Sequence, residues 1–160
     1  LAVAPDLVER RHASLRKAEQ RARRTAEPEA YHRLRIAGKR FRYALEFLSE
    51  VYPGETKVLI RRTVALQDLL GAFQDADVAI ARLRELSATR SAELGPQTIF
   101  AMGEVAERYR GSMKASLAGV APAFARLDDK TWKRFHKRLE AARPAPPAPR
   151  PAPPPPDPVP

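Results

Sequence analysis

The sequence predicts an all-α protein, an antiparallel helical bundle followed by a proline-rich tail. Two observations support this fold class. Apolar residues recur at the three- and four-residue spacing of helices, and the two-residue alternation typical of strands is absent. Prolines are few and widely spaced as far as Pro122, where they mark helix starts because proline is tolerated inside a helix only in its first turn.

Pro5, Pro28, Pro53, Pro96 and Pro122 divide the predicted helical domain, residues 6–142. The helices are expected at residues 6–26, 29–52, 55–73, 76–92, 97–118 and 130–142, with a shorter turn near 122–127. Gly71 is expected to end or loosen the third helix. Asp75 suits the N-cap of the fourth, because its carboxylate can accept from free amides two or three residues later. Short connections imply antiparallel neighbours.

The final segment, residues 143–160, is predicted to be a disordered tail. Eleven of the sixteen prolines fall between Pro144 and Pro160. Such a run lacks backbone donors and builds no core, so it should be extended and solvated. We interpret it as a spacer, with a PxxP-type peptide ligand as the alternative.

Composition narrows the classes of function. The chain carries 29 Lys and Arg against 19 Asp and Glu, a formal net charge of +10, which favours a phosphate-rich partner. The lack of cysteine excludes disulfides, thiolate zinc sites and cysteine nucleophiles, and fits a reducing, cytoplasmic compartment. No membrane span is expected. We find no nucleophile–base set and no glycine-rich phosphate loop, so neither catalysis nor a cofactor is expected.

The second predicted helix carries a row of cations on one face. At about 100° per residue, four positive or potentially positive side chains fall within roughly a quarter of the circumference: His32, Arg35, Lys39 and Arg42. Leu34, Phe41 and Leu45 collect nearly opposite. Like charges in adjacent turns repel by a few tenths of a kcal/mol per pair. An anionic ligand would offset that cost.

The first and third predicted helices extend this pattern. The first places four cations on one face: Arg10, Lys17, Arg21 and Arg24. The third adds Lys57 and Arg61, one turn apart. Side by side, these helices would form a basic wall suited to a long flexible polyanion. The alternative is that the cations simply form solvated helix faces.

Three short motifs resemble the CHAD family, whose name stands for conserved histidine α-helical domain. They are HRLRI at residues 32–36, KRFRYALE at 39–46 and LQDLLG at 66–71, followed by Asp75. The resemblance implies an all-α domain of two symmetry-related bundles whose basic residues line a central channel. It implies binding of inorganic polyphosphate and association with polyphosphate granules. It also implies that a CYTH-type triphosphate hydrolase domain often stands beside the CHAD domain in the same chain.

Because HRLRI occurs once, the chain is similar to the second half of such a domain. His32, Arg35, Lys39 and Arg42 match the family's basic positions, and Lys57 and Arg61 match less closely. Val64 departs from the pattern, which places a basic residue there. The resemblance implies inorganic polyphosphate as ligand, and the first helical bundle or a CYTH-type domain as further partners.

Competing interpretations remain open at this point. Charge alone also fits a nucleic-acid-binding module, and the chain could be an accessory half of a CYTH-type enzyme. Metal binding at His32 is not expected, because its face carries cations and no convergent ligands. Asp75 and Asp77 suit capping and ion pairing better than a metal.

Other polar and aromatic residues receive structural roles or none. Gln67 and Asp68 are expected to satisfy backbone groups or to orient a neighbouring arginine. His12 and His136 lie in polar helical surroundings and receive no role. An apolar stripe on the last helix is expected to close the core: Trp132, Phe135 and Leu139.

Overall fold

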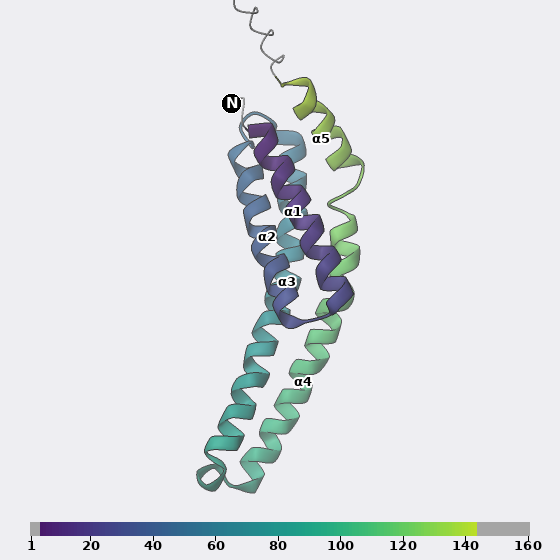
Figure 1. Ribbon diagram of the computed structural model, residues 1–160. Coiled ribbons are helices and arrows are strands. Elements are labelled where there is room, and N and C mark those ends of the chain that lie inside the picture. The colour runs from purple at the N-terminus through teal and green to yellow at the C-terminus, as the bar shows by residue number, and fades with distance from the viewer. Residues whose placement is uncertain (1–3, 144–160) are drawn as a thin grey trace, which may run out of the picture.

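The computed structural model describes residues 4–143, and these form five helices without a strand (Figure 1). They are α1 (Ala4–Thr25), α2 (Pro28–Phe47), α3 (Pro53–Thr89), α4 (Ser91–Ala125) and α5 (Lys130–Ala141). Consecutive helices from α1 to α4 pack against each other, and α5 packs against α3 and α1. The all-α bundle is confirmed. The predicted proline-rich tail lies outside the described residues.

Prolines mark the starts of α2 and α3 as expected, and a capping residue that was not predicted, Asp129, marks the start of α5. Pro28 and Pro53 stand in the first turns of α2 and α3, and Asp129 caps α5 by accepting from the Thr131 amide at 2.7 Å. The second helix is shorter than predicted, because residues 48–52 form turns. The physical reason is Pro53, which disfavours helical backbone in the residue before it.

The predicted break near Gly71 and Asp75 was wrong. α3 runs unbroken from Pro53 to Thr89, so Asp75 lies in mid-helix and caps nothing. Phe73, Ala76 and Ile80 are buried and continue the apolar face through the expected break. Gly71 lies within this helix, and Arg35 Nε of α2 is 3.9 Å from where a Cβ would stand, an ordinary contact distance.

The fourth helix also differs from its prediction. Gly95 has φ 71° and ψ 161°, a left-handed φ that favours glycine, and it separates a short turn from the long helix that follows. That helix continues past Pro122 to Ala125 rather than ending near residue 118. Buried Val120 and Phe124 explain the continuation, since their packing outweighs one lost backbone hydrogen bond.

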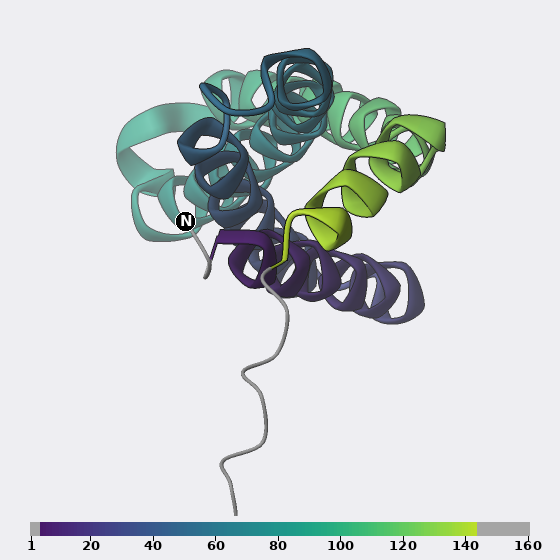
Figure 2. The same cartoon turned by 90° about the horizontal axis from the view of Figure 1, so that it is seen from above.

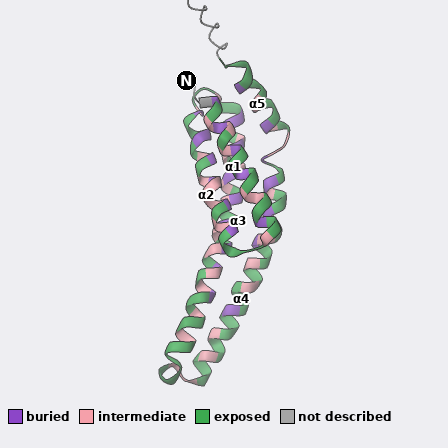
Figure 3. Ribbon diagram, viewed as in Figure 1, coloured by how far each residue is buried: buried purple, intermediate pink, exposed green. Residues whose placement is uncertain are grey.

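The core lies in the upper bundle, where the buried residues gather (Figure 3). All five helices contribute residues to it, and Figure 2 shows their arrangement from above. The buried apolar residues of the first two helices include those predicted from periodicity: Val8, Leu15, Ala22, Leu34, Phe41, Leu45 and Leu48. Below this bundle, α3 and α4 continue as a two-helix arm (Figure 1), which exposes Phe100 and Val78.

Helix α5 closes the core, as its apolar stripe predicted. Trp132, Phe135 and Leu139 are buried. The polar surroundings assigned to His12 were wrong, because its ring is buried and stacks on Trp132 with centroids 3.6 Å apart. The local sequence around His12 is polar, and only the docking of α5 covers the ring.

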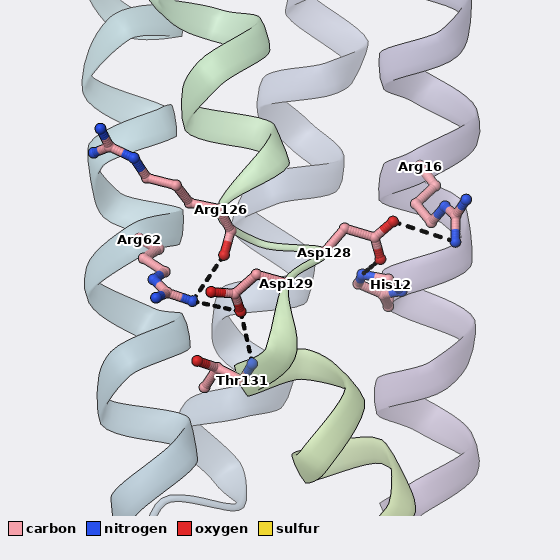
Figure 4. A network of polar contacts seen from close by, with 7 residues as sticks. All are labelled: His12, Arg16, Arg62, Arg126, Asp128, Asp129 and Thr131. Atoms are coloured by element: carbon pink, nitrogen blue, oxygen red, sulfur yellow. Dashed lines mark hydrogen bonds and ion pairs between the residues drawn. The ribbon is translucent and has the colours of Figure 1, made fainter.

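Ion pairs fix α5 and the turn that precedes it (Figure 4). Arg62 Nη1 donates to the carbonyl oxygen of Arg126 and to Asp129 Oδ1, both at 2.8 Å. Arg138 Nη1 donates to both carboxylate oxygens of Glu55 at 2.8 Å. This hydrogen bond lowers the pKa of the Glu55 carboxyl. Burial raises the pKa of Asp129, but the hydrogen bonds from Arg62 and Thr131 outweigh it, and the net shift is downward.

Two glycines of α4 offer a test of this packing. Gly111→Ala should stabilise the protein by about 0.5–1 kcal/mol, because alanine favours helix and no atom lies within 4 Å of the new Cβ. A Cβ on Gly119 would lie 3.0 Å from both Leu69 methyl carbons, so Gly119→Ala should be the less stable variant. Urea unfolding measures the free energy of unfolding of both variants. An equal gain in stability for the two would contradict the packing of α4 on α3.

Candidate anion-binding surface

The predicted cations of α2 lie along its contact with α3. Gln67 of α3 lies 3.7 Å from where a Cβ would stand on Gly38, and Arg35 crosses Gly71. At about 100° per residue, Arg42 continues the side of α2 that bears Arg35. We call this strip, made by Arg35, Gly38, Lys39 and Arg42 of α2 with Gln67 and Gly71 of α3, the α2–α3 seam. His32 is half-buried next to it.

Three buried donors in the α2–α3 seam make no hydrogen bond among the described residues. They are Arg35 Nε, Arg42 Nε and Gln67 Nε2, of which Arg42 Nε has Glu46 Oε1 at 3.5 Å without the geometry of a hydrogen bond. A buried donor without a partner costs about 1–3 kcal/mol, and native proteins keep few of them. Gln67 and Arg35 lie at ordinary van der Waals distances from where a Cβ would stand on Gly38 and Gly71. An oxygen acceptor from an added group would satisfy these donors once the side chains turn toward it, because the three nitrogens are closed to solvent as they stand.

The charges of the seam are little neutralised. Within residues 4–143, no carboxylate lies within 4.0 Å of a charged nitrogen of His32, Arg35 or Lys39. Arg42 has one, Glu46 of its own helix, at 3.5 Å and partly exposed. By contrast, Arg33, Arg62 and Arg138 each hold a carboxylate at 3.0 Å or less. Arg62 and Arg138, which connect α3 with α5, are thus paired with carboxylates, whereas the seam keeps a net positive charge.

The cations of α1 occupy a neighbouring surface rather than the seam. All four are exposed and unpaired within the part of the chain described here: Arg10, Lys17, Arg21 and Arg24. Arg11 and Ser14 line the hollow between α1 and α2, and the helical period places Arg10, Lys17 and Arg21 on the outer side next to Ser14. The single basic wall predicted across three helices is therefore two basic surfaces on either side of α2.

The remaining predicted cations are more peripheral. Lys57 and Arg61 are exposed in the first turns of α3, and the helical period directs them away from Arg62, which faces α5. The structure does not bring Arg61 to the seam. Neither residue has an ion pair among the described residues, so both add positive charge to the outer surface.

Sequence reasoning missed Gln67 as part of the site. It was expected to satisfy backbone groups or to orient an arginine, yet its amide nitrogen has no partner. The signal was its place one residue after Leu66, on the flank of the buried face of α3. Which neighbouring helix that flank meets depends on the tertiary packing.

Two further properties of the described residues bear on the site. No group of three or more His, Asp or Glu side chains is arranged to hold a metal ion in residues 4–143. None of the helices there has the length and apolar character needed to cross a membrane.

Comparison with known proteins supports the resemblance noted from the motifs. A family model, described as the CHAD domain, matches residues 1–84, which is more than half of the 160 residues. The match includes all three motifs and ends within α3. No curated protein and no solved structure matches the chain.

Proposed function

The chain belongs to the CHAD family, and we propose that it binds inorganic polyphosphate along the α2–α3 seam. The family is associated with polyphosphate-related proteins. The observation that carries the proposal is the set of three buried donors without hydrogen bonds, beside cations without adequate counter-charge.

The chemistry of the ligand matches that of the seam. Arg35, Lys39 and Arg42 recur at successive turns, about 5–6 Å apart along the helix axis. Polyphosphate offers non-bridging oxygens and negative charge along a flexible chain. Arginine donates to such oxygens in pairs and lysine acts as a point charge. The neutral amide of Gln67 adds a donor where a further charge would increase repulsion.

The proposed role is binding without catalysis. The seam offers positive charge and donors, and Glu46 is the one carboxylate within 4.0 Å of its cations among residues 4–143. Binding there would place the protein at cytoplasmic polyphosphate granules. A polyanion bound at the seam could also be passed to a partner domain. That partner would be a CYTH-type triphosphate hydrolase domain or the first CHAD bundle.

Competition with nucleic acid tests the choice of polyanion. Labelled long-chain polyphosphate is bound to the full chain, and duplex DNA or RNA is added at equal phosphate concentration and ionic strength. We expect little displacement, because a flexible polyphosphate chain can follow cations spaced about one helical turn apart, whereas a nucleic-acid duplex is stiff. Displacement as effective as by unlabelled polyphosphate would favour the nucleic-acid alternative.

Replacing Gln67 by leucine should separate binding from stability. The variant keeps the volume and removes a buried donor without an acceptor. Polyphosphate affinity should fall about fivefold, equivalent to about 1 kcal/mol, while the free energy of unfolding should not decrease. Gln97→Leu, at an exposed position in the arm, is the matched control. A Gln67→Leu protein that binds like the wild type would remove Gln67 from the site.

A further inference from the structure

A second basic recess lies between α1 and α2, on the other side of α2 from the seam. It consists of two adjoining hollows. One has a volume of about 300 Å³ and polar walls formed by Arg11, Ser14, Arg33 and Arg40. The other, of about 290 Å³, shares Arg11 and Arg40 and adds the apolar side chains of Leu7, Tyr43 and Phe47. We call the two hollows together the α1–α2 groove.

The charges of this groove have no evident structural role. Arg33 is held by Glu29 of its own helix at 3.0 Å. Arg11 and Arg40 face the same hollows from opposite helices, and neither has a carboxylate within 4.0 Å among residues 4–143. Two cations that converge across a recess repel each other, and a bound anion would reverse that interaction.

The aromatic side chains at the upper end of the groove are unusually exposed. Tyr43 is 55% exposed and Phe47 is 69% exposed, and they stand one helical turn apart. The other aromatic residue of this part of α2, Phe41, is fully buried. Arg42 lies over the Tyr43 ring, with its guanidinium carbon 5.1 Å from the ring centroid. This end of the groove therefore offers aromatic surface, with the Arg42 cation over one of the two rings.

From this juxtaposition we infer that the α1–α2 groove binds a nucleoside di- or triphosphate. The phosphates would lie between Arg11 and Arg40, with the Ser14 hydroxyl as a further donor. The base would stack on Tyr43 and Phe47, since aromatic side chains bind bases through their faces. Each hollow is at the lower limit of typical ligand pockets, and the two adjoining hollows give room for both parts of the ligand. This site is independent of the polyphosphate proposal, because bare polyphosphate has no ring to stack.

The affinity of the full chain for ATP and for inorganic triphosphate tests this inference. Both are measured by isothermal titration calorimetry without divalent cations at one ionic strength. We expect ATP to bind about tenfold more tightly, as stacking of one base predicts. Phe47→Ala should abolish that preference, and Phe100→Ala, at a 71% exposed arm position, should leave it intact. Equal affinity of the wild type for the two ligands would overturn the inference.

Arginine variants distinguish this groove from the seam. Arg11→Gln with Arg40→Gln should weaken ATP binding more than tenfold and keep the helical circular dichroism spectrum. Arg35→Ala with Lys39→Ala, which keeps Arg42 over the Tyr43 ring, should preserve the preference for ATP over triphosphate. If the seam variant loses the preference while the groove variant keeps it, the nucleotide site is not in the α1–α2 groove.

Discussion

Lowering the pH from 7 to 5 is expected to reduce the free energy of unfolding by about 2 kcal/mol through a single side chain, His12. The His12 ring is 4% exposed and stacked on Trp132. Burial lowers its pKa from 6.5 to about 4; nearby Asp128 opposes the shift, and Arg16 and His136 add to it. Between those two pKa values the unfolded chain binds a proton that the folded protein excludes. Stability therefore falls as the pH falls through this range.

Urea unfolding at pH 7, 6 and 5 measures the effect. His12→Phe keeps an aromatic ring against Trp132 and removes the titrating group, so its stability should vary much less over this range. The Glu55 and Asp129 carboxyls, whose pKa values are lowered, affect stability in a lower pH range. Their stabilisation is present above their ordinary pKa values and is lost only at lower pH, as the carboxyls are protonated. Identical pH profiles for the wild type and His12→Phe would contradict the buried, neutral histidine.

Removing the three charges of the α2–α3 seam should reduce polyphosphate affinity at least about a hundredfold. In the variant Arg35→Ala/Lys39→Ala/Arg42→Ala each substitution removes a charge-assisted contact, and such contacts contribute about 1.5–3 kcal/mol each without strict additivity. The slope of log affinity against log salt should become shallower by about three, one for each lost phosphate contact. Fluorescence anisotropy with labelled polyphosphate at several salt concentrations gives both quantities.

A charge-matched variant in the arm is the control. Arg84, Arg108 and Lys114 are exposed, and none has an ion pair among the described residues. Their joint replacement by alanine removes the same charge from a surface that lacks buried donors. We expect less than a threefold change in affinity. If the two triple variants lose affinity equally, net charge alone explains binding and the seam has no special role.

The residues that were predicted correctly are those whose local pattern determines their position. Leu34, Phe41 and Leu45 share a helix face, and one face of α2 must be buried for the bundle to form. The same period places Arg35 and Arg42 together on another side. Trp132, Phe135 and Leu139 likewise fall on one face of α5 and close the core.

The features that were missed depend on contacts between helices. Gly71 resembles a helix terminator in sequence, but buried Phe73, Ala76 and Ile80 continue the apolar face of α3 past it. Pro122 marks a boundary in the sequence pattern, but the helix continues past it because Val120 and Phe124 are buried on either side. His12 has polar neighbours in sequence, and its burial follows from the docking of α5. The separation of the α1 cations from the seam follows from the order in which α1, α2 and α3 pack.

The central claim is that the buried donors of the α2–α3 seam contact phosphate oxygens. Side-chain nitrogen–proton NMR spectra of the full chain, recorded while polyphosphate is added, test it directly. The Nε–H signals of Arg35 and Arg42 and the amide signals of Gln67 should shift in proportion to occupancy, while Arg84 Nε–H in the arm stays unchanged. Saturating polyphosphate that leaves the three seam signals in place and moves arginine signals elsewhere would contradict the account.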